Sequence, residues 1–413
     1  MSNRFCLYPR INLDIGFADL LFSLSSLVYP FKQEEPKILQ QFAQNDKQVL
    51  VTLSVRTAFD LLLQALDLPE GSEVLMSAVT IPDMVEIVKS HGLVPVAINI
   101  SIDTLAPDID ALEQKITDKT KLILIAHLYG TVLDLTAVIQ IARKYNILLI
   151  EDCAQAFWGD KYCGDRQADV SLFSFGPIKS CTALGSAIAC VGDRELANKM
   201  LAIQAQYPCK SKFWFFRRVL KYLFLKLLTL PRIYFLLMVV VNALGFKLDA
   251  MISILLRNFS KGDLHSKIRY LPPQKMVDLL WHRLNNYDNE AFEQRAKRAR
   301  FVLALFSDKI NYPGVQATNH SFWLVPIFVA NPVLLINILR NHGFDATTGN
   351  TSLVHIGNDS TQNIQKNTLL EKHLKQQILY LPISEYLSEI ALTDMADLVR
   401  ENASPTTPFL DRI

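Results

Sequence analysis

Seven short runs of apolar residues lie between residues 49 and 192: VLVTL, EVLMSA, VPVAINI, KLILIAHL, ILLIED, DVSLFSF and SAIACVG. Segments with apolar residues at helical spacing separate several of them, among them TAFDLLLQAL, DMVEIVKSHG and DLTAVIQIARKY. Short runs that are apolar at nearly every position are typical of strands buried on both faces. The alternation therefore predicts an α/β fold, with a mainly parallel sheet and helices on both of its faces.

The size and charge of the chain narrow the class of protein that it can be. With 413 residues it exceeds the usual size of a single hydrophobic core, so we expect two lobes. The 42 lysine and arginine residues nearly balance the 40 aspartate and glutamate residues. This balance argues against a nucleic-acid-binding protein that acts through a broad basic surface, so small-molecule partners are expected.

The cysteines and the start of the chain indicate a reducing compartment. The six cysteines form no CxxC pair and are not spaced with the eight histidines as metal ligands are. The first residues, MSNRFCLYPRINLDIG, lack the charged and apolar regions of a signal peptide. We therefore expect a cytoplasmic protein with free thiols, no disulfide framework and no metal site.

The pattern changes in the second half of the chain. Residues 212–259 are rich in aromatic and aliphatic side chains, and 278–306 are expected to form one long amphipathic helix. The rest alternates strand and helix, which favours a smaller α+β lobe. We expect an N-terminal segment (1–35) that packs with the small domain, a large domain (36–265), and a connecting helix with the small domain (266–413).

Three reactive side chains follow neighbouring strands of the predicted sheet. Asp152 ends the run ILLIED, Ser174 lies at the end of DVSLFSF, and Lys179 follows five residues later in a loop. In an open α/β sheet, ligands bind at the carboxyl ends of the strands. A pyridoxal 5'-phosphate (PLP) site requires a lysine that holds the aldehyde as a Schiff base and an aspartate that keeps the pyridine nitrogen protonated. The three residues therefore predict a PLP site.

Four segments carry a resemblance to a known family. They are LIEDCAQAFWG, SLFSFGPIKSCTALGSA, EVLMSAVTIPDMVEIVKSHGLVPVAINISIDTL and DKTKLILIAHLYGTVLDLTAVIQIARKYN. In sequence and spacing they resemble the DegT/StrS group of PLP-dependent sugar aminotransferases, over residues 10–205 and more weakly over 265–413. The resemblance implies a fold type I PLP-dependent transferase, with a seven-stranded sheet and a smaller C-terminal α+β domain. It also implies a homodimer whose sites are shared between subunits.

The resemblance assigns a role to each residue that matches the family pattern. Lys179 would hold the cofactor and, once released, move the proton between substrate carbon and cofactor carbon. A lysine with that task needs a lowered pKa, which an apolar pocket supplies. Asp152 would pair with the pyridinium, Gln155 would lie beside the ring hydroxyl, and Ser174 would donate to the phosphate. The helix that starts near Arg56 would direct its amino end at the same phosphate.

Structural roles compete with these assignments. Asp152 alone could cap a helix, Gln155 could lie exposed in a loop, Ser174 could cap a strand end, and Lys179 could be solvated. Their occurrence together and in this order favours the functional interpretation, because perturbed lysines and carboxylates concentrate at functional sites. We expect His127 to be a hydrogen-bonded strand-end residue rather than a catalyst. The cysteine after Asp152 is expected to serve packing, because no Cys-His arrangement lies near it.

The sequence departs from the family pattern at several positions. Val55 and Arg56 stand where the family usually has Gly-Thr, so the backbone approaches a phosphate less freely while Arg56 offers a charge. Ile81 replaces an aromatic residue that stacks on the cofactor ring. In SKIRYLPP, Lys267 and Arg269 stand in place of an asparagine that the family often supplies from the neighbouring subunit, so Lys267 would give a point charge to the phosphate. TTGNTSLVHIG replaces a histidine-rich segment of the sugar site, which leaves the substrate open.

The insertion at 212–259 is longer than the family's usual connection. Its longest uncharged stretch, IYFLLMVVVNALGF, has 14 residues, fewer than the roughly 20 needed to cross a bilayer. Basic residues alternate there with aromatic and aliphatic ones. This composition favours a pair of helices that lies in the membrane interface, at the inner face of the membrane. Packing on the same subunit or on a dimer partner is the alternative.

Together these patterns predict a PLP-dependent aminotransferase. The expected acceptor is a keto group on a nucleotide-linked or lipid-linked sugar, and the expected donor is an amino acid such as glutamate. One alternative is a PLP-dependent sugar dehydratase, although such relatives commonly carry histidine at the position of Lys179. A second alternative is a membrane-associated binding protein on a fold that has lost its chemistry, as Val55, Ile81 and the insertion suggest.

Overall fold

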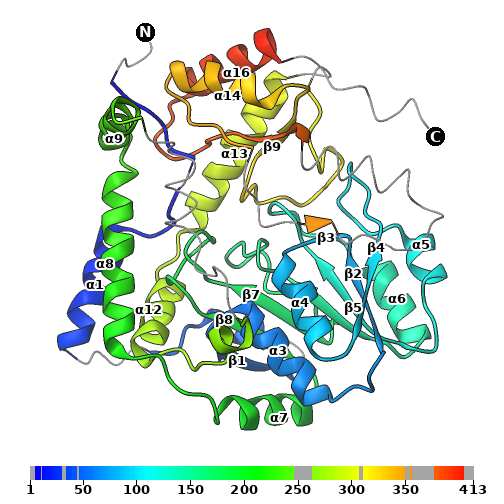
Figure 1. Ribbon diagram of the computed structural model, residues 1–413. Helices are drawn as coiled ribbons and strands as arrows, with labels where there is room; N and C mark the ends of the chain where they lie inside the picture. The colour runs from blue at the N-terminus through cyan, green and yellow to red at the C-terminus, as the bar shows by residue number, and fades with distance from the viewer. Residues whose placement is uncertain are drawn as a thin grey trace.

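A seven-stranded sheet forms the centre of the larger lobe (Figure 1). The computed structural model describes residues 5–10, 12–29, 34–43, 46–245, 263–306, 310–348, 354–355 and 376–403. The strand order is β1-β8-β7-β6-β5-β2-β4. In that order the strands span Gln48–Thr52, Ala187–Val191, Val170–Ser174, Leu148–Asp152, Thr120–Ala126, Glu73–Ser77 and Val94–Ile98.

Only β8 runs against the other strands of this sheet, because it pairs antiparallel with both β1 and β7 while the remaining pairs are parallel. The prediction of a mainly parallel seven-stranded sheet is confirmed. All seven strands coincide with the apolar runs of the sequence to within two residues at each end.

Helices cover both faces of the sheet, as the apolar runs predicted. Successive strand residues alternate between the faces, so Leu122 and Leu124 join one core cluster while Ile123 and Ile125 join another. The first face packs against α3 (Val55–Leu66), α4 (Pro82–Ser90) and α7 (Arg194–Gln204). The second packs against α5 (Ile109–Gln114), α6 (Thr136–Lys144), α1 (Phe17–Val28), α8 (Lys212–Leu228) and α12 (Gln274–Asn285).

The smaller lobe has its own core. The short antiparallel pair β9 (Pro326–Phe328) and β11 (Ile378–Tyr380) packs with three helices. These are α13 (Asn289–Leu305), α14 (Pro332–Asn341) and α16 (Glu389–Asn402). A second short pair, β3 (Val79–Thr80) with β10 (Val354–His355), joins the C-terminal part of the chain to the large lobe near the start of α4.

The long helix expected over 278–306 is wrong, because α12 and α13 are separate helices. α12 ends at Asn285, and Asn286 leaves the helical backbone region, with φ −124° and ψ 22°. The Asp288 carboxylate then accepts a hydrogen bond from the Glu290 N–H at 2.8 Å and caps α13. Asn and Asp compete with helix hydrogen bonds and favour caps, so this short polar stretch ends one helix and begins the next.

The insertion forms two helices up to the point where the structure describes it. α8 is followed, after Thr229 and Leu230, by α9 (Pro231–Ala243), which begins with its proline. No single helix among the described residues has the length and apolar character of a membrane span; α8 and α9 meet these criteria only together, and they are bent by 89°. Residues 246–259 of the insertion lie outside the described residues.

Each insertion helix is fixed to a different part of the molecule. The buried Lys226 of α8 donates to the Leu13 carbonyl at 2.9 Å, and α8 packs against α1. Tyr234 of α9 donates to the carboxylate of Asp345, which also accepts from Arg10 at 2.7 Å. α8 therefore belongs to the wall of the large lobe, whereas α9 is bonded to the small lobe and the N-terminal segment.

Candidate active site

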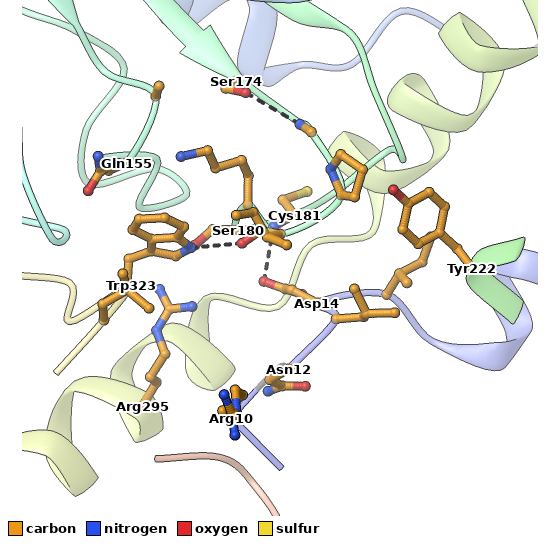
Figure 2. Close-up of a pocket in the computed structure, with 18 of the residues that line it drawn as sticks. Arg10, Asn12, Asp14, Gln155, Ser174, Ser180, Cys181, Tyr222, Arg295 and Trp323 are labelled. Atoms are coloured by element: carbon orange, nitrogen blue, oxygen red, sulfur yellow. Dashed lines mark hydrogen bonds between the residues drawn. The ribbon is translucent and has the colours of Figure 1, made fainter. Parts of the chain in front are cut away.

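A cleft of about 2090 Å³ lies between the lobes and contains every site residue that the sequence predicted. Residues of α3, the ends of β6 and β7, the inner face of α8, and the loops of the small lobe line it. The predicted residues on its walls are Val55, Arg56, Asp152, Gln155, Ser174, Lys179 and Lys267. Figure 2 shows several of them around the cleft, with Ser174 and Gln155 on its large-lobe side.

Lys179 is a partly buried amine that faces an aromatic ring. It lies in a turn after β7, where its N–H donates to the Gly176 carbonyl at 3.0 Å. Its Nζ is 4.0 Å from the centre of the Trp323 ring. Burial lowers the pKa of Lys179 to about 8, with Arg56 acting in the same direction and Asp152 opposing it. About a tenth of the amine is therefore neutral at pH 7, far more than for an ordinary lysine, and this neutral form is what a nucleophile or base requires.

Asp152 and Gln155 are held at the carboxyl end of β6. Burial raises the pKa of Asp152, although Lys179 and a hydrogen bond from the Ala154 N–H at 3.0 Å act against it. Gln155 accepts from the Tyr129 N–H at 2.8 Å, which fixes the orientation of its side chain at the cleft. A buried carboxylate of this kind is stabilised by any cation that binds beside it.

The amino end of α3 faces the cleft. Ser54 caps the helix by accepting from the Thr57 N–H at 3.2 Å, and Val55 and Arg56 begin its first turn. The Arg56 guanidinium donates to the Asp83 carboxylate of α4 at 2.5 Å, so its charge is shared with an acid on the same wall. Ser174 lies nearby and accepts a long hydrogen bond, 3.4 Å, from the Gly176 N–H.

Lys267 reaches the cleft from α11 (His265–Ile268), and a buried aspartate fixes that helix to α3. Asp60 of α3 accepts from Arg269 Nε at 2.9 Å and from Nη2 at 3.0 Å. It also accepts from His91 Nε2 at 2.9 Å. Burial opposes ionisation of Asp60, but these partners lower its pKa to about 2.

A buried polar network lies behind the site. Glu151 accepts hydrogen bonds from Tyr162 Oη at 2.5 Å, the Asp165 N–H at 2.7 Å and the Ser171 hydroxyl. His127 Nε2 lies 3.2 Å from Glu151, and its Nδ1 accepts from a backbone N–H, as expected of a hydrogen-bonded strand-end histidine. These partners hold the pKa of Glu151 below its usual range despite complete burial.

The same network bears on metal binding. Ligand atoms of His127, Glu151 and Cys153 lie within 4.8 Å of one another. The histidine and the glutamate are already engaged in hydrogen bonds, and burial raises the pKa of the Cys153 thiol, which keeps it protonated. Cys153 is therefore a packing residue, as the sequence indicated, and all six cysteines of the chain are free thiols.

Two cleft residues escaped the sequence analysis. Trp323, whose Nε1 donates to the Ile178 carbonyl at 3.0 Å, comes from the small lobe, and Arg295 comes from α13. The Trp323 ring lies 4.0 Å from Lys179 Nζ. Arg295 also lines the cleft, where Figure 2 shows it on the same side as Trp323. Neither residue is part of a local motif; the only signal is an aromatic residue at the start of the run SFWLVPIFV.

Comparison with known proteins finds a family that the large lobe resembles. Residues 25–215 match the sequence model of the DegT/DnrJ/EryC1/StrS aminotransferase family. The matched segment is a little under half of the chain. It contains the strand ends that carry Asp152, Ser174 and Lys179, and the resemblance inferred from the sequence is confirmed.

The matches to individual relatives extend over only about half of each relative. GDP-perosamine synthase of Escherichia coli O157:H7 is 35% identical over 175 residues, which are 41% of this chain and 48% of that protein. UDP-4-amino-4-deoxy-L-arabinose–oxoglutarate aminotransferase of Shewanella sediminis is 35% identical over 208 residues, 48% of this chain and 53% of that protein. The chain therefore spans about half the length of these curated relatives.

The fold similarity extends over nearly the whole chain. The aminotransferase TlmJ from Streptoalloteichus hindustanus superposes with a TM-score of 0.68 at 16% identity, covering 96% of this chain and 98% of that one. At this identity the likeness concerns the fold, and it includes the small lobe that the family segment does not reach.

Proposed function

We propose that the protein is a PLP-dependent aminotransferase that acts on a keto sugar. The observation that carries this proposal is the pair of buried, oppositely charged groups at neighbouring strand ends. Burial lowers the pKa of Lys179 and raises that of Asp152 in the same cleft. Titratable groups whose environments shift their pKa values in this way mark acid and base roles.

The residues present fit the cofactor. A buried carboxylate needs a cation, and a protonated pyridine supplies one. A buried amine with a lowered pKa loses its proton readily and suits attachment to an aldehyde. Asp152 would hold the ring nitrogen, Gln155 the ring hydroxyl, and Ser174 the phosphate. The first turn of α3, with Val55 and Arg56, and Lys267 would complete the anion-binding wall. PLP bound there would supply an electron sink beside the reacting carbon.

The protein's own contribution is to position groups, move a proton and exclude water. Lys179 would hold the cofactor through Nζ and, when displaced by a substrate amine, would carry a proton between two carbons as a neutral base. The Trp323 ring covers the amine from the side of the small lobe. Ile81, which is half-buried at the start of α4 and lines the cleft, would cover part of the ring with an aliphatic side chain.

The relatives support the class of substrate. Their names describe transfer of amino groups to sugars carried on GDP or UDP and, in one case, to a sugar phosphate. We propose an amino acid such as glutamate as donor and a nucleotide-linked or lipid-linked keto sugar as acceptor. A dehydratase is the alternative within the same cofactor, and the position of Lys179 in the cleft favours amino transfer over it.

The test is covalent attachment of the cofactor to one lysine. Purified protein is mixed with PLP and its absorbance is recorded before and after borohydride, beside Lys179→Ala. A band near roughly 410–430 nm that reduction fixes on the peptide containing Lys179 is expected. Lys199→Ala, which removes an exposed lysine of α7, is the matched control. A colourless wild type would indicate a binding protein that has lost the chemistry.

We also propose that the protein is a homodimer, as the family resemblance implies. Sedimentation velocity at micromolar concentration is expected to give a species of twice the chain mass. Mixed dimers offer a sharper test of shared sites. Mixing Lys179→Ala with Lys267→Ala subunits should restore part of the activity if Lys267 serves the neighbouring site, whereas no recovery would place Lys267 in its own subunit's site.

We further propose peripheral membrane contact through the outer faces of α8 and α9. Between residues 212 and 245 the sequence has six basic residues and no acidic one. Arg218 and Lys226 point inward, toward the cleft, so Lys212, Arg217, Lys221 and Arg232 remain to complement an anionic bilayer. One side of α8 lines the cleft, while the opposite side exposes a stripe of apolar side chains, and α9 exposes another. The exposed residues are Phe213, Phe216, Leu220, Phe224, Leu227, Ile233, Leu236, Val239, Val240 and Leu244.

Cosedimentation with vesicles tests this contact. Wild-type protein is expected to pellet with vesicles of phosphatidylglycerol and phosphatidylcholine, and less with phosphatidylcholine alone. The double variant Leu220→Ser/Phe224→Ser should lose binding, whereas Val333→Ser, on the exposed surface of α14, should not. A wild type that ignores both kinds of vesicle and stays monodisperse without detergent would refute the membrane contact.

A further inference from the structure

The side of α8 that faces the cleft alternates aromatic and basic residues. Every fourth residue of the helix from 214 to 226 lines the cleft, and these residues are Trp214, Arg218, Tyr222 and Lys226. Residues spaced by four lie on one face of a helix, and at 1.5 Å per residue this stripe extends for about 18 Å. The match to the family model ends at residue 215, so Arg218, Tyr222 and Lys226 lie beyond it, within the insertion.

Arg218 is the cation at the middle of this stripe. Its Nε donates to the Leu184 carbonyl. The carbon of its guanidinium lies 5.2 Å from the centre of the Trp214 ring and 5.4 Å from the centre of the Tyr222 ring. Burial lowers the pKa of Arg218, and Tyr222 acts against that shift. The two rings and the carbonyl therefore hold the guanidinium in one place on the wall of the cleft.

No carboxylate neutralises this guanidinium. Within the ranges that the structure describes, no acidic side chain forms an ion pair with Arg218, and no acceptor is bonded to its terminal N–H groups. Arg283, which lines the same cleft, instead pairs with Asp14 at 3.1 Å and with Asp19 at 2.6 Å. A partly buried cation without a counter-charge is costly, so Arg218 favours the binding of an anion that enters the cleft.

The stripe faces the loop that carries the reacting amine. Leu184, whose carbonyl accepts from Arg218, belongs to the loop that contains Lys179 and leads into β8. Figure 2 shows the Tyr222 side chain directed from α8 toward Ser180 and Cys181 in the same loop. The insertion therefore reaches the reacting part of the cleft.

The opposite side of α8 is apolar. Phe216, Leu220 and Phe224 are also spaced by four, and they are 36%, 41% and 59% exposed. An α-helix with its side chains is about 10 Å across, so a cation that faces the cleft and an apolar outer surface are only one helix diameter apart. A diphosphate joined to a hydrocarbon chain combines the same two properties, whereas a nucleotide would contact only the inner side.

We propose that the inner face of α8 binds the diphosphate of an acceptor sugar that is carried on an isoprenoid lipid. The proposal rests on the aminotransferase function proposed above, and it selects the lipid-linked acceptor over the nucleotide-linked one. The terminal N–H groups of Arg218 would donate to two oxygens of the diphosphate, a geometry that suits a guanidinium and a phosphate. The hydrocarbon chain would pass round α8 to its exposed apolar side, where the bilayer contact is proposed.

Calorimetry with water-soluble probes tests the site. The full-length protein, incubated with PLP, is titrated with farnesyl diphosphate and, separately, with UDP. Arg218→Gln is expected to weaken the binding of farnesyl diphosphate by about 10- to 100-fold, the effect of losing a charge-assisted contact, and Arg218→Lys should restore part of it. UDP should bind about 10-fold more weakly than farnesyl diphosphate, or weaker still. Arg194→Gln, which removes an exposed arginine of α7, is the matched control and should leave both affinities unchanged.

Two results would overturn the proposal. One is binding of farnesyl diphosphate that is indifferent to Arg218 but lost in Ser174→Ala, which would place the probe on the candidate phosphate groups of the cofactor. The other is UDP that binds as tightly as farnesyl diphosphate, which would assign the site to a nucleotide carrier. If the glutamine variant does not fold, chemical protection in the wild type decides the question. Farnesyl diphosphate should protect Arg218 from phenylglyoxal, as mapped by mass spectrometry, and UDP at the same concentration should not; no protection by farnesyl diphosphate refutes the site.

The outcomes separate this inference from the proposed function. Failure of PLP to attach to Lys179 would remove the aminotransferase activity, while binding of farnesyl diphosphate through Arg218 would stand by itself. Attachment of PLP together with diphosphate binding that ignores Arg218 would remove only the lipid-diphosphate site.

Discussion

The carboxylate of Asp60 offers a quantitative test of how the cleft is held together. Asp60 is fully buried on α3, and Arg269 and His91 donate to it. Its replacement by asparagine keeps the shape but leaves the Arg269 guanidinium without its counter-charge. Removing one partner of a buried ion pair costs about 3–5 kcal/mol of unfolding free energy, and we expect the lower end because the Arg269 side chain is 37% exposed to water. The same change should release α11 from α3 and weaken PLP binding, because Lys267 lies on α11.

The pKa of Asp60 sets how this cost depends on pH. Its pKa of about 2 lies below the ordinary value of 3.8. The ionised form is thus favoured in the folded state, so the stabilisation is complete above pH 4–5 and is lost as the pH falls toward 2. The shift corresponds to about 2 kcal/mol, of which about half remains at pH 3.

Urea unfolding followed by circular dichroism measures both quantities. The difference in unfolding free energy between wild type and Asp60→Asn should be several kcal/mol at pH 7 and should shrink by about 1 kcal/mol near pH 3. A double-mutant cycle with Arg269→Gln should give a coupling energy above about 1 kcal/mol. A cost below about 1 kcal/mol at pH 7, or a difference that does not change with pH, would refute the assignment of Asp60 as an ionised anchor.

Further predictions concern the amine, the buried network and one glycine. Because burial brings the pKa of Lys179 to about 8, the rate at which it captures PLP should rise with pH and reach half its maximum near pH 8; a midpoint near 10.5 in stopped-flow absorbance would contradict this. Glu151→Gln should lower the unfolding free energy by about 3–5 kcal/mol, since an amide cannot accept all the donors around it; a near-neutral effect in urea unfolding would show that the network is dispensable. Gly130→Ala should lower the unfolding free energy by about 3 kcal/mol, because the backbone is at φ +101° and the new Cβ would lie 2.5 Å from the Trp323 backbone nitrogen. Gly71→Ala, at φ +79° in open space, should lower it by only about 1 kcal/mol. Equal losses for the two variants in thermal melts would contradict the steric argument.

The strands and the reactive strand ends could be predicted because their signals are local. A run such as KLILIAHL is apolar at nearly every position only where both faces of a strand are buried, and the alternation of Leu122 with Ile123 between two clusters agrees with that. Asp152 could be predicted as a site residue because it ends such a run, and Lys179 because it lies in the loop that follows one. The direction of β8 was not foreseen, because an antiparallel strand in this setting has the same composition as its parallel neighbours.

The small-lobe side of the site could not be predicted from local patterns. Arg295 lies on a helix whose sequence, AFEQRAKRARFVLALF, has several basic residues at equivalent spacings. Only tertiary packing distinguishes Arg295 and Arg298, which line the cleft, from Lys297 and Arg300, which are exposed. The break between α12 and α13 had a local signal in the polar residues Asn286 and Asp288, but the amphipathic pattern on either side of it concealed the change of direction.

Glu151 and Asp152 are adjacent in the chain, yet their side chains lie in different parts of the molecule. Successive side chains of a strand point to opposite faces, so β6 directs one acid into the network of buried donors and offers the other to the cleft. A slip of β6 by a single residue relative to β5 and β7 would put one acid in the place of the other and an uncharged neighbour in the place it left. A carboxylate would then lose its hydrogen-bond donors, and another would be withdrawn from the reacting groups. Insertions and deletions in the loops that set the register of β6 should therefore abolish function more completely than most substitutions within the site.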